Sequence, residues 1–304
     1  MADYSHLMGW NDNPKEVERI MSTLPFPSVA SCIAGIEGSG RGKTVLLYKF
    51  FKMATGQDLI DRLQVGPDCV SMGSALGVDI IKVVQHVLNK TLEEFTGYTA
   101  TEPIYGGSRV AIGGGQLGYG GGSNGIWAAK YVQQYGTVVR KKYGNIDLSI
   151  YDYSKAEQWG RPRVGVPKEV EIVSKEHKVL TISQVSTFYE LMDCVNNGYP
   201  ITIASSRGFN TTRDKDGFLR PQGSWPHQMC IIGAKDDNRP GALIENSWGR
   251  DWVNGPKGEF DDMPDGSFWV DAQVLERDIL SAGDSWAYSN FEGYPPQDLD
   301  LRPF

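Results

Sequence analysis

The stretch that decides the fold is QVGPDCVSMGSALGVD, which covers Gln64–Asp79 and contains a lone cysteine, Cys69. From Cys69 to residue 95, apolar residues recur at steps of three and four, which predicts one long helix that begins at the cysteine. A helix N-terminus carries a partial positive charge that favours a thiolate. A buried cysteine in such a place is nevertheless more often a packing residue than a nucleophile. The rest of the sequence has to decide between these two interpretations.

The composition excludes several classes of function. The chain has 304 residues, 40% of them hydrophobic and 22% charged, which is enough for one large domain or two smaller ones. A net charge of −7 gives no electrostatic basis for nucleic-acid binding. The first residues lack the apolar core of a secretion signal, and no apolar run has the length of a membrane span. We therefore expect a cytoplasmic protein with no nucleic-acid partner.

The four cysteines and four histidines show neither a disulfide framework nor a metal-binding pattern. No CxxC pair and no HExxH segment occurs. So few cysteines in a chain of this length indicate a reducing compartment. We expect no metal and no other cofactor. Cys194 and Cys230 lie in apolar runs that predict core positions, and Cys32 has no assigned partner.

The order of helix-prone and strand-prone segments predicts an α+β protein with two lobes. An N-terminal extension, residues 1–60, contains an expected helix at 44–56. Residues 61–150 form a helical lobe with the long helix and a second helix at 124–136. Residues 151–290 hold short β-prone runs at 169–174, 199–206, 227–235, 241–248 and 266–272. The Pro-rich residues 291–304 are expected to form an exposed polar arm.

Two glycine-rich segments resemble nucleotide-binding loops without meeting their requirements. GSGRGKT, residues 38–44, lacks the first glycine of a P-loop, because Glu37 occupies that place. GGGQLG, residues 113–118, follows the strand-like RVAI, but the acidic residue that would bind a ribose is missing further on. Both segments are interpreted as connectors.

Three distant segments carry residues that can act together on a carbonyl group. Cys69 follows Gln64, His227 opens one expected strand, and Asn246 ends the next. His227 would take the thiol proton and later protonate a leaving amine. Asn246 would accept a hydrogen bond from the other ring nitrogen and fix the tautomer.

Two further side chains complete this arrangement. The Gln64 side chain and the backbone N–H of Cys69 would donate hydrogen bonds to the developing oxyanion. Trp248 would cover the bond between His227 and Asn246 and exclude water from it. Because His227, Asn246 and Trp248 accompany it, Cys69 is interpreted as a nucleophile rather than a packing residue.

The segments ENSWG (245–249), HQMCIIG (227–233) and GSNGIWAAKYVQQYG (122–136) resemble the papain family of C1-type cysteine peptidases. The resemblance implies a papain-like two-lobed fold, in which a helical lobe built on a long central helix meets an antiparallel β-barrel-like lobe. It also implies a Cys-His-Asn triad and a peptide or protein substrate. QVGPDCVSMG is similar to a signature of papain-like proteins encoded by tailed bacteriophages, which would add the virion as a location.

The sequence also departs from the family around these residues. PDCVS replaces the usual surroundings of the nucleophile, Pro226 precedes the histidine, and Gln64 is one residue closer to the cysteine than is usual. The main hypothesis is a peptidase or amidase, with a weak or inactive structural protein of a phage particle as the alternative. In that alternative, residues 1–60 and 291–304 would dock onto other virion proteins. A third hypothesis is that residues 1–60 act as an inhibitory propeptide. We rank this role below docking, because these residues contain no apolar run that would fit a cleft.

Overall fold

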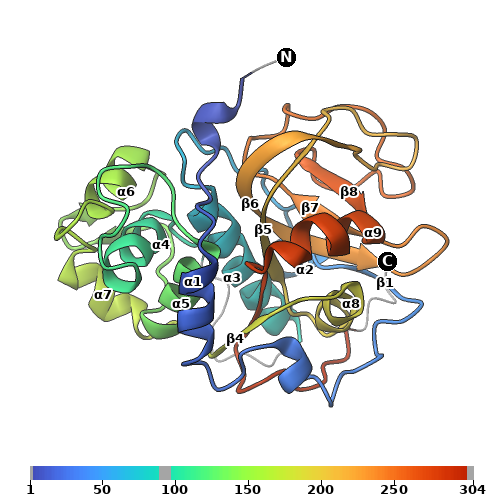
Figure 1. The fold of residues 1–304 in the computed structure, drawn as a ribbon, viewed down its shortest axis with the longest axis horizontal. Coiled ribbons are helices and arrows are strands. Elements are labelled where there is room, and N and C mark those ends of the chain that lie inside the picture. Colours follow the sequence, from blue (N-terminus) through green and yellow to red (C-terminus); the bar gives the residue numbers. More distant parts are fainter. Residues whose placement is uncertain (1–2, 89–96, 300–304) are drawn as a thin grey trace.

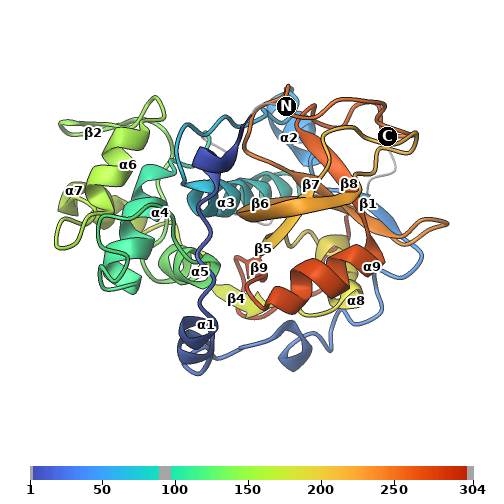
Figure 2. The same ribbon diagram turned by 45° about the horizontal axis from the view of Figure 1, so that its top comes forward.

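The computed structural model describes residues 3–88 and 97–299 and contains two lobes joined along one long helix (Figures 1 and 2). That helix, α3 (Cys69–Val87), begins at the cysteine as the sequence predicts. The last residues of the expected helix, 89–95, lie outside the described part of the chain. The expected second helix is α5 (Gly125–Gln134). The helical lobe also contains α4 (Glu102–Gly107), α6 (Tyr153–Trp159), α7 (Lys168–Ser174) and the hairpin β2 (Lys142–Tyr143) and β3 (Ile146–Asp147).

The second lobe is built on an antiparallel sheet. Its spatial order is β4-β9-β5-β6-β7-β8, and β1 also pairs with β6. The bounds are β1 (Thr44–Leu46), β4 (Thr181–Gln184), β5 (Ile201–Phe209), β6 (Pro221–Lys235), β7 (Gly241–Glu245), β8 (Ser267–Asp271) and β9 (Trp286–Ser289). The remaining α-helices are α1 (Pro14–Met21), α2 (Lys49–Thr55), α8 (Phe188–Asn196) and α9 (Ala272–Val274). Short 3-10 or π turns cover Ser5–Leu7, Val29–Ser31, Ser108–Ile112, Leu275–Ile279 and Leu280–Ala282.

Helix α3 is buried on nearly all sides because it forms a wall of both hydrophobic cores. Leu76, Ile80 and Val84 belong to the core of the β-rich lobe. Val70 and Val78 belong to the core of the helical lobe. Each fully buried aliphatic side chain of this size contributes roughly 1.5–3 kcal/mol. The helix therefore joins the two lobes, and its N-terminal end is fixed between them.

A glycine in α3 allows the sheet to approach the helix closely. A Cβ atom on Gly73 would lie 3.1 Å from the carbonyl oxygen of Met229 in β6. Further along the helix, a Cβ on Gly77 would lie 3.2 Å from the ring of Tyr288 in β9. Such distances leave no room for a larger side chain without displacement of the strand.

Residues 1–60 do not form a separate extension. Strand β1 pairs with β6, and Phe50 and Phe51 of α2 are buried in the same core as β6. The expected helix at 44–56 therefore divides into a strand and a helix, which ends at Gly56 with a φ of 74°. Pairing with the edge of β6 overrides the local helical pattern of residues 44–46.

The end of the chain likewise packs against the body, as far as the structure describes it. Tyr294 is buried, and Gln297 donates from its backbone to Asn197 Oδ1 at 3.0 Å. The Tyr199 hydroxyl donates to the carbonyl oxygen of Pro295. Residues 291–299 are therefore not a free arm, and residues 300–304 lie outside the described part of the chain.

The expected strand at 169–174 is the helix α7. EVEIVS alternates polar and apolar residues, which is typical of a half-buried strand. The structure buries Val170 but leaves Ile172 66% exposed, so the apolar residues do not share one face. Pro167 directly precedes the helix, and Glu169 and Glu171 lie in its first turn, where the helix dipole favours acidic side chains.

The two glycine-rich segments are held by charged side chains of the chain itself. The backbone N–H groups of Gly38 and Gly40 donate to the Asp193 carboxylate, and that of Gly42 donates to Asp236. In the second segment, the strand-like residues 108–112 form a π turn. The Arg109 guanidinium there binds carbonyl oxygens of the following glycines, among them Gly118 and Gly120. Carboxylates thus occupy the donors that a nucleotide phosphate would need in residues 38–42.

The close approach at Gly73 gives a first prediction. Gly73→Val should lower the free energy of unfolding by about 1–3 kcal/mol, because the new side chain must displace Met229 of β6. Urea unfolding followed by circular dichroism measures the change. Glu18→Val, at an exposed position of α1, controls for the helix propensity of valine and should change stability by less than about 0.5 kcal/mol. Equal effects of the two substitutions would contradict the prediction.

Candidate active site

Cys69 is the first residue of α3 and is completely buried. The preceding residue, Asp68, makes no side-chain capping bond to the helix. Its carboxylate instead accepts a hydrogen bond from the Tyr151 hydroxyl at 2.9 Å. The thiol consequently lies at a helix N-terminus whose N–H groups are not neutralised by a capping side chain. This placement agrees with the helix start that the sequence predicts.

His227 and Asn246 lie beside each other on neighbouring strands. His227 belongs to β6, and Asn246 directly follows β7. The His227 Nε2 and Asn246 Oδ1 atoms are 2.8 Å apart, and both residues are buried. The backbone N–H of Ser247 also donates to Asn246 Oδ1 at 2.7 Å. This second donor identifies that atom as the amide oxygen, so Nε2 of the histidine must carry the hydrogen.

The other ring nitrogen of His227 is left without a hydrogen-bond partner. Nδ1 is buried, and no atom of the described residues bonds to it. With the proton on Nε2, Nδ1 presents its lone pair and can accept a proton. A buried polar atom without a partner is uncommon and calls for an explanation, for which a catalytic role is one candidate.

Helix α3 and strand β6 are tied together next to these residues. The Gln228 side chain donates from Nε2 to the carbonyl oxygen of Val70 at 3.0 Å and to Ser74 Oγ at 3.1 Å. Gln228 follows His227 and Val70 follows Cys69, so the bond joins the immediate neighbours of the two residues. The backbone N–H of Gln228 also stabilises the anionic form of Cys69. The structure therefore brings the thiol to the strand segment that carries the histidine.

The Gln64 side chain bonds to two backbone carbonyl groups, and Trp248 packs beside His227. The Gln64 side chain is buried and donates from Nε2 to the carbonyl oxygens of Leu7 at 2.8 Å and Gly66 at 2.7 Å. Trp248 is buried with its ring centroid 4.8 Å from that of His227. The backbone of Leu63 pairs with that of Trp248, which connects the segment before Gln64 to the segment after Asn246.

A stretch near the N-terminus, residues 3–12, covers the site, and we call it the covering segment (Figures 1 and 2). Its Gly9 N–H lies at the Cys69 thiol, where it favours the anionic form. The Gly9 carbonyl accepts from Ser123 N at 2.8 Å, and Trp10 N donates to the carbonyl oxygen of Pro226 at 3.1 Å. The segment therefore contacts both lobes. It bonds to Pro226, directly before His227, in the β-rich lobe and to Ser123, shortly before α5, in the helical lobe.

Side chains anchor the covering segment at both ends. The Tyr4 ring stacks on Trp248 with centroids 4.6 Å apart. Trp10 is buried, and its indole N–H donates to Asp284 Oδ2 at 2.7 Å. Between them, a Cβ atom on Gly9 would lie 2.1 Å from the carbonyl oxygen of Pro67, so only glycine fits there. No sequence pattern indicates this contact, because it depends on backbone atoms and single side chains rather than on an apolar run.

Burial determines the charge state of the site in this conformation. Desolvation raises the pKa of the Cys69 thiol to about 12, although the N–H groups of Gln228 and Gly9 oppose the shift. Desolvation also lowers the pKa of His227 to about 4, against the opposing effect of Asn246. Both groups are therefore neutral near pH 7. Burial therefore opposes the ion pair that transfer of the thiol proton to His227 would create.

The remaining cysteines and two of the remaining histidines are not part of the group around Cys69, whereas two tryptophans pack beside it. Cys194 and Cys230 are buried core residues, Cys32 is partly buried, and all four cysteines are free thiols. His86 is partly buried near the end of α3, and His177 follows α7. Trp225 and Trp252 pack against Trp248, at centroid distances of 4.8 and 5.4 Å. Within residues 3–88 and 97–299, no group of three or more potential metal ligands occurs, and no helix is long and apolar enough to cross a membrane.

Comparison with solved structures identifies the architecture. Xylellain, a cysteine protease from Xylella fastidiosa, matches with a TM-score of 0.55 and 16% identity over 96% of this chain and 94% of that chain. The fold is papain-like. Procathepsin L2 of Tenebrio molitor larval midgut matches this papain-like fold with a TM-score of 0.57 and 13% identity, over 94% of this chain and 79% of that chain. The proform of the ragweed pollen cysteine protease Amb a 11 matches with a TM-score of 0.52 and 10% identity, over 97% of this chain and 76% of that chain.

These similarities concern the fold alone. The sequence matches no family model and no curated protein. Identities between 10% and 16% place the chain among structures of papain-like cysteine proteases without transferring an activity to it. The activity must be argued from the residues of the site.

The fit of Gly9 gives a second prediction. Gly9→Leu should increase the rate at which iodoacetamide alkylates Cys69 at pH 8 by about tenfold or more, because the segment must move away from Pro67. The raised pKa leaves only a very small thiolate fraction in the covered state, and access of water restores it. Mass spectrometry of the Cys69 peptide measures the rate.

The matched control for this experiment is His6→Leu, which places the same side chain at an exposed position of the covering segment. It should leave the alkylation rate within about twofold of the wild type. Equal rates for Gly9→Leu and His6→Leu would show that Gly9 does not hold the segment over the thiol.

Proposed function

We propose that this protein is a papain-like cysteine peptidase or amidase whose nucleophile is Cys69. The observation that carries the proposal is the hydrogen bond between His227 Nε2 and Asn246 Oδ1, which leaves Nδ1 unpartnered beside the strand segment that touches the thiol. Similarity to the folds of cysteine proteases supports the same conclusion. A peptide or protein is the proposed substrate, and no cofactor is needed.

The chemistry follows from the hydrogen positions. His227 Nδ1 takes the proton from the Cys69 thiol, and the sulfur forms a bond to the substrate carbonyl carbon. When the C–N bond breaks, the same proton passes from Nδ1 to the leaving amine. Water then attacks the carbonyl carbon of the thioester and gives a proton to Nδ1. The C–S bond breaks, the acid product leaves, and the proton returns from Nδ1 to the sulfur. Asn246 keeps the ring in the required tautomer throughout.

Gln64 is proposed as the side-chain donor to the oxyanion. Its Nε2 already donates to a carbonyl oxygen, that of Leu7 in the covering segment, at 2.8 Å. A substrate carbonyl in the same place would receive the same hydrogen bond, and the charge that develops on it would strengthen that bond. The shorter spacing between Gln64 and Cys69 therefore does not prevent the amide from reaching a carbonyl at the site. Trp248 is proposed to shield the bond between His227 and Asn246 from water.

The covering segment is proposed to hold the enzyme in an inactive state. It occupies the Gln64 donor with the Leu7 carbonyl and places Gly9 at the thiol. Residues 3–12 cover the site, and further along the chain Phe50 and Phe51 lie in the core of the β-rich lobe. This arrangement favours inhibition over docking as the role of the first residues.

An inactive structural protein of a phage particle remains the alternative. The neutral, covered site is the observation that favours it, since a protein that only docks needs no accessible thiol. The phage origin rests on the similarity of QVGPDCVSMG to phage-encoded proteins. Location in a host cytoplasm or a virion follows from that origin.

Removal of residues 2–12 gives a third prediction and decides between these functions. The shortened chain keeps Asn13, which caps α1, and Asp284 keeps its bonds to Trp286 and Gly125. It should hydrolyse a fluorogenic peptide library, and Cys69→Ala in the same background should be inactive. A folded shortened chain that neither cleaves peptides nor reacts with a thiol-directed epoxide at Cys69 would contradict the enzymatic function and support the structural alternative.

Asn246 gives a fourth prediction. In the shortened chain, Asn246→Ala should lower kcat by about 10²-fold, because the imidazole loses its orientation and tautomer. The loss should affect kcat more than KM. Asn145→Ala, in the exposed turn between β2 and β3, is the matched control and should retain full activity. Unchanged kcat for Asn246→Ala in a chain of normal stability would remove Asn246 from the mechanism.

A further inference from the structure

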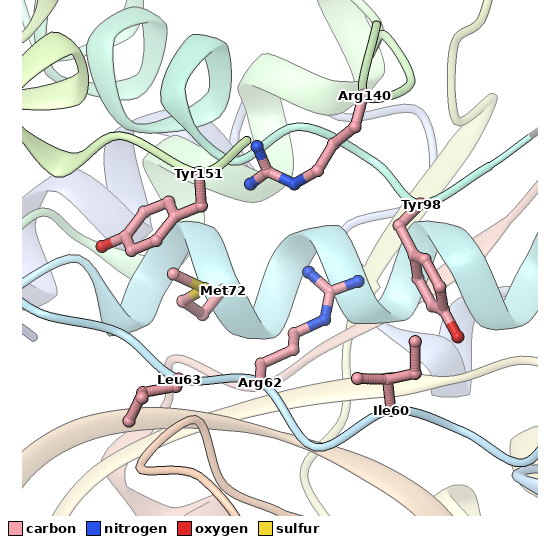
Figure 3. A pocket seen from close by; sticks show the side chains of 7 residues that line it. All are labelled: Ile60, Arg62, Leu63, Met72, Tyr98, Arg140 and Tyr151. Carbon is pink, nitrogen blue, oxygen red and sulfur yellow. The ribbon is translucent and has the colours of Figure 1, made fainter. Parts of the chain in front are cut away.

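A cavity lies on the flank of α3 (Figure 3). Its volume is about 190 Å³, and seven residues line it: Ile60, Arg62, Leu63, Met72, Tyr98, Arg140 and Tyr151. Figure 3 shows the segment 60–63 on one side of the cavity, the helical lobe on the other, and α3 behind it. The cavity has the size of a single amino-acid residue rather than of an extended peptide.

Two guanidinium groups of this cavity are fixed from behind by buried carboxylates. Arg62 Nη2 donates to Asp79 Oδ2, and the other oxygen of Asp79 accepts from the backbone N–H of Thr99 at 2.9 Å. Arg140 Nη1 donates to Glu102 Oε1 at 3.1 Å. Both carboxylate side chains are completely buried, so the arginine side chains are held in place before any ligand binds.

Arg62 retains a donor that the described residues do not use, whereas Arg140 also donates to Thr101 Oγ1 and to the carbonyl oxygen of Leu148. Arg62 Nε is buried and has no hydrogen-bond acceptor among the described residues. A guanidinium offers five N–H donors in a planar fork that matches a carboxylate. Figure 3 shows the Arg62 guanidinium in front of α3 and the Arg140 guanidinium above the helix, on the side of the helical lobe. The side chains of Arg62 and Arg140 line the cavity and remain 12% and 19% exposed, so a ligand with a planar anionic group can accept hydrogen bonds from their exposed parts.

The rest of the lining is apolar and aromatic. Ile60 and Leu63 are 53% and 61% exposed, which is unusual for large aliphatic side chains, and Met72 lies behind them on α3. The rings of Tyr98 and Tyr151 lie beside the two guanidinium groups, with Cζ to centroid distances of 5.9 and 5.7 Å. These surfaces suit an apolar or aromatic body attached to the anionic group.

The charges favour a ligand with a single negative charge. Asp79 and Glu102 already balance the two arginines. A doubly charged phosphate would meet more repulsion from these two carboxylates than a carboxylate would. We propose that this cavity binds a carboxylate carried on an apolar or aromatic skeleton, either a free acid of amino-acid size or the C-terminal residue of a peptide. This inference does not depend on catalysis at Cys69.

Methyl NMR of the full chain tests the proposal. Methionine methyl groups are labelled with ¹³C, and the Met72 signal is assigned with Met72→Leu. N-acetyl-phenylalanine should shift the Met72 signal until the cavity is saturated. Its amide should bind at least about tenfold more weakly, because the amide lacks the charge that the arginines recognise. N-acetyl-Ala-Ala-Phe as acid and amide forms the second pair. Binding of the single residue identifies a free acid as the source, and binding of the tripeptide acid alone identifies a chain end.

Variants localise the binding. Leu63→Glu adds a negative charge at the exposed rim and should weaken binding of the acid by about tenfold or more. Ile172→Glu, at an exposed site on α7, should leave the affinity for the acid unchanged. Arg62→Lys keeps the charge beside Asp79 but removes the Nε donor and should also weaken binding. The proposal is overturned if neither acid shifts Met72 up to about 20 mM, if acid and amide bind equally, or if Leu63→Glu binds like the wild type.

Discussion

The contact between helix α3 and strand β6 is the constraint on which the rest of the structure depends. The helix carries Cys69 at its first residue, and the strand carries His227. Gly73 lets the strand approach, and Gln228 bonds to the backbone beside Cys69. If the two elements separated, the thiol and the imidazole would belong to different lobes with no shared site. The buried aliphatic side chains on both sides of α3 therefore maintain the geometry of the candidate triad as well as the stability of the protein.

The same burial that orders the site also opposes the ionisation of Cys69 and His227. A helix dipole and neighbouring N–H groups favour a thiolate, but they act on a group from which water is excluded. Removal of water raises the pKa of Cys69 and lowers that of His227, so both groups hold their neutral forms. The covering segment supplies part of this burial through Gly9 and Trp10. The charge state of the site is thus coupled to the position of a short segment near the N-terminus.

The site and the cavity with the two arginines are linked by one stretch of chain. Arg62 lines the cavity, and Gln64, two residues later, lies at the thiol site. Tyr151 lines the same cavity and bonds to Asp68, the neighbour of Cys69. A ligand in the cavity would therefore touch Arg62, which is close in sequence to the proposed oxyanion donor Gln64, and Tyr151, which bonds to the residue before α3. Such a connection needs no movement of the lobes, because it passes through adjacent residues and one hydrogen bond.

The sequence by itself predicted much of the fold and the residues of the candidate site, since these depend on local patterns. Periodic apolar residues predict α3 and α5, the β-prone runs predict β5 to β8, and ENSWG with HQMCIIG indicates Asn246 and His227. It failed where long-range contacts outweigh local preference. Residues 44–46 pair with β6, residues 169–174 become a helix, and residues 291–299 pack against the body. Only the tertiary structure decided that residues 3–12 cover Cys69 and that Arg62 and Arg140 share a cavity, because backbone hydrogen bonds and single contacts between distant residues leave no periodic pattern in a sequence.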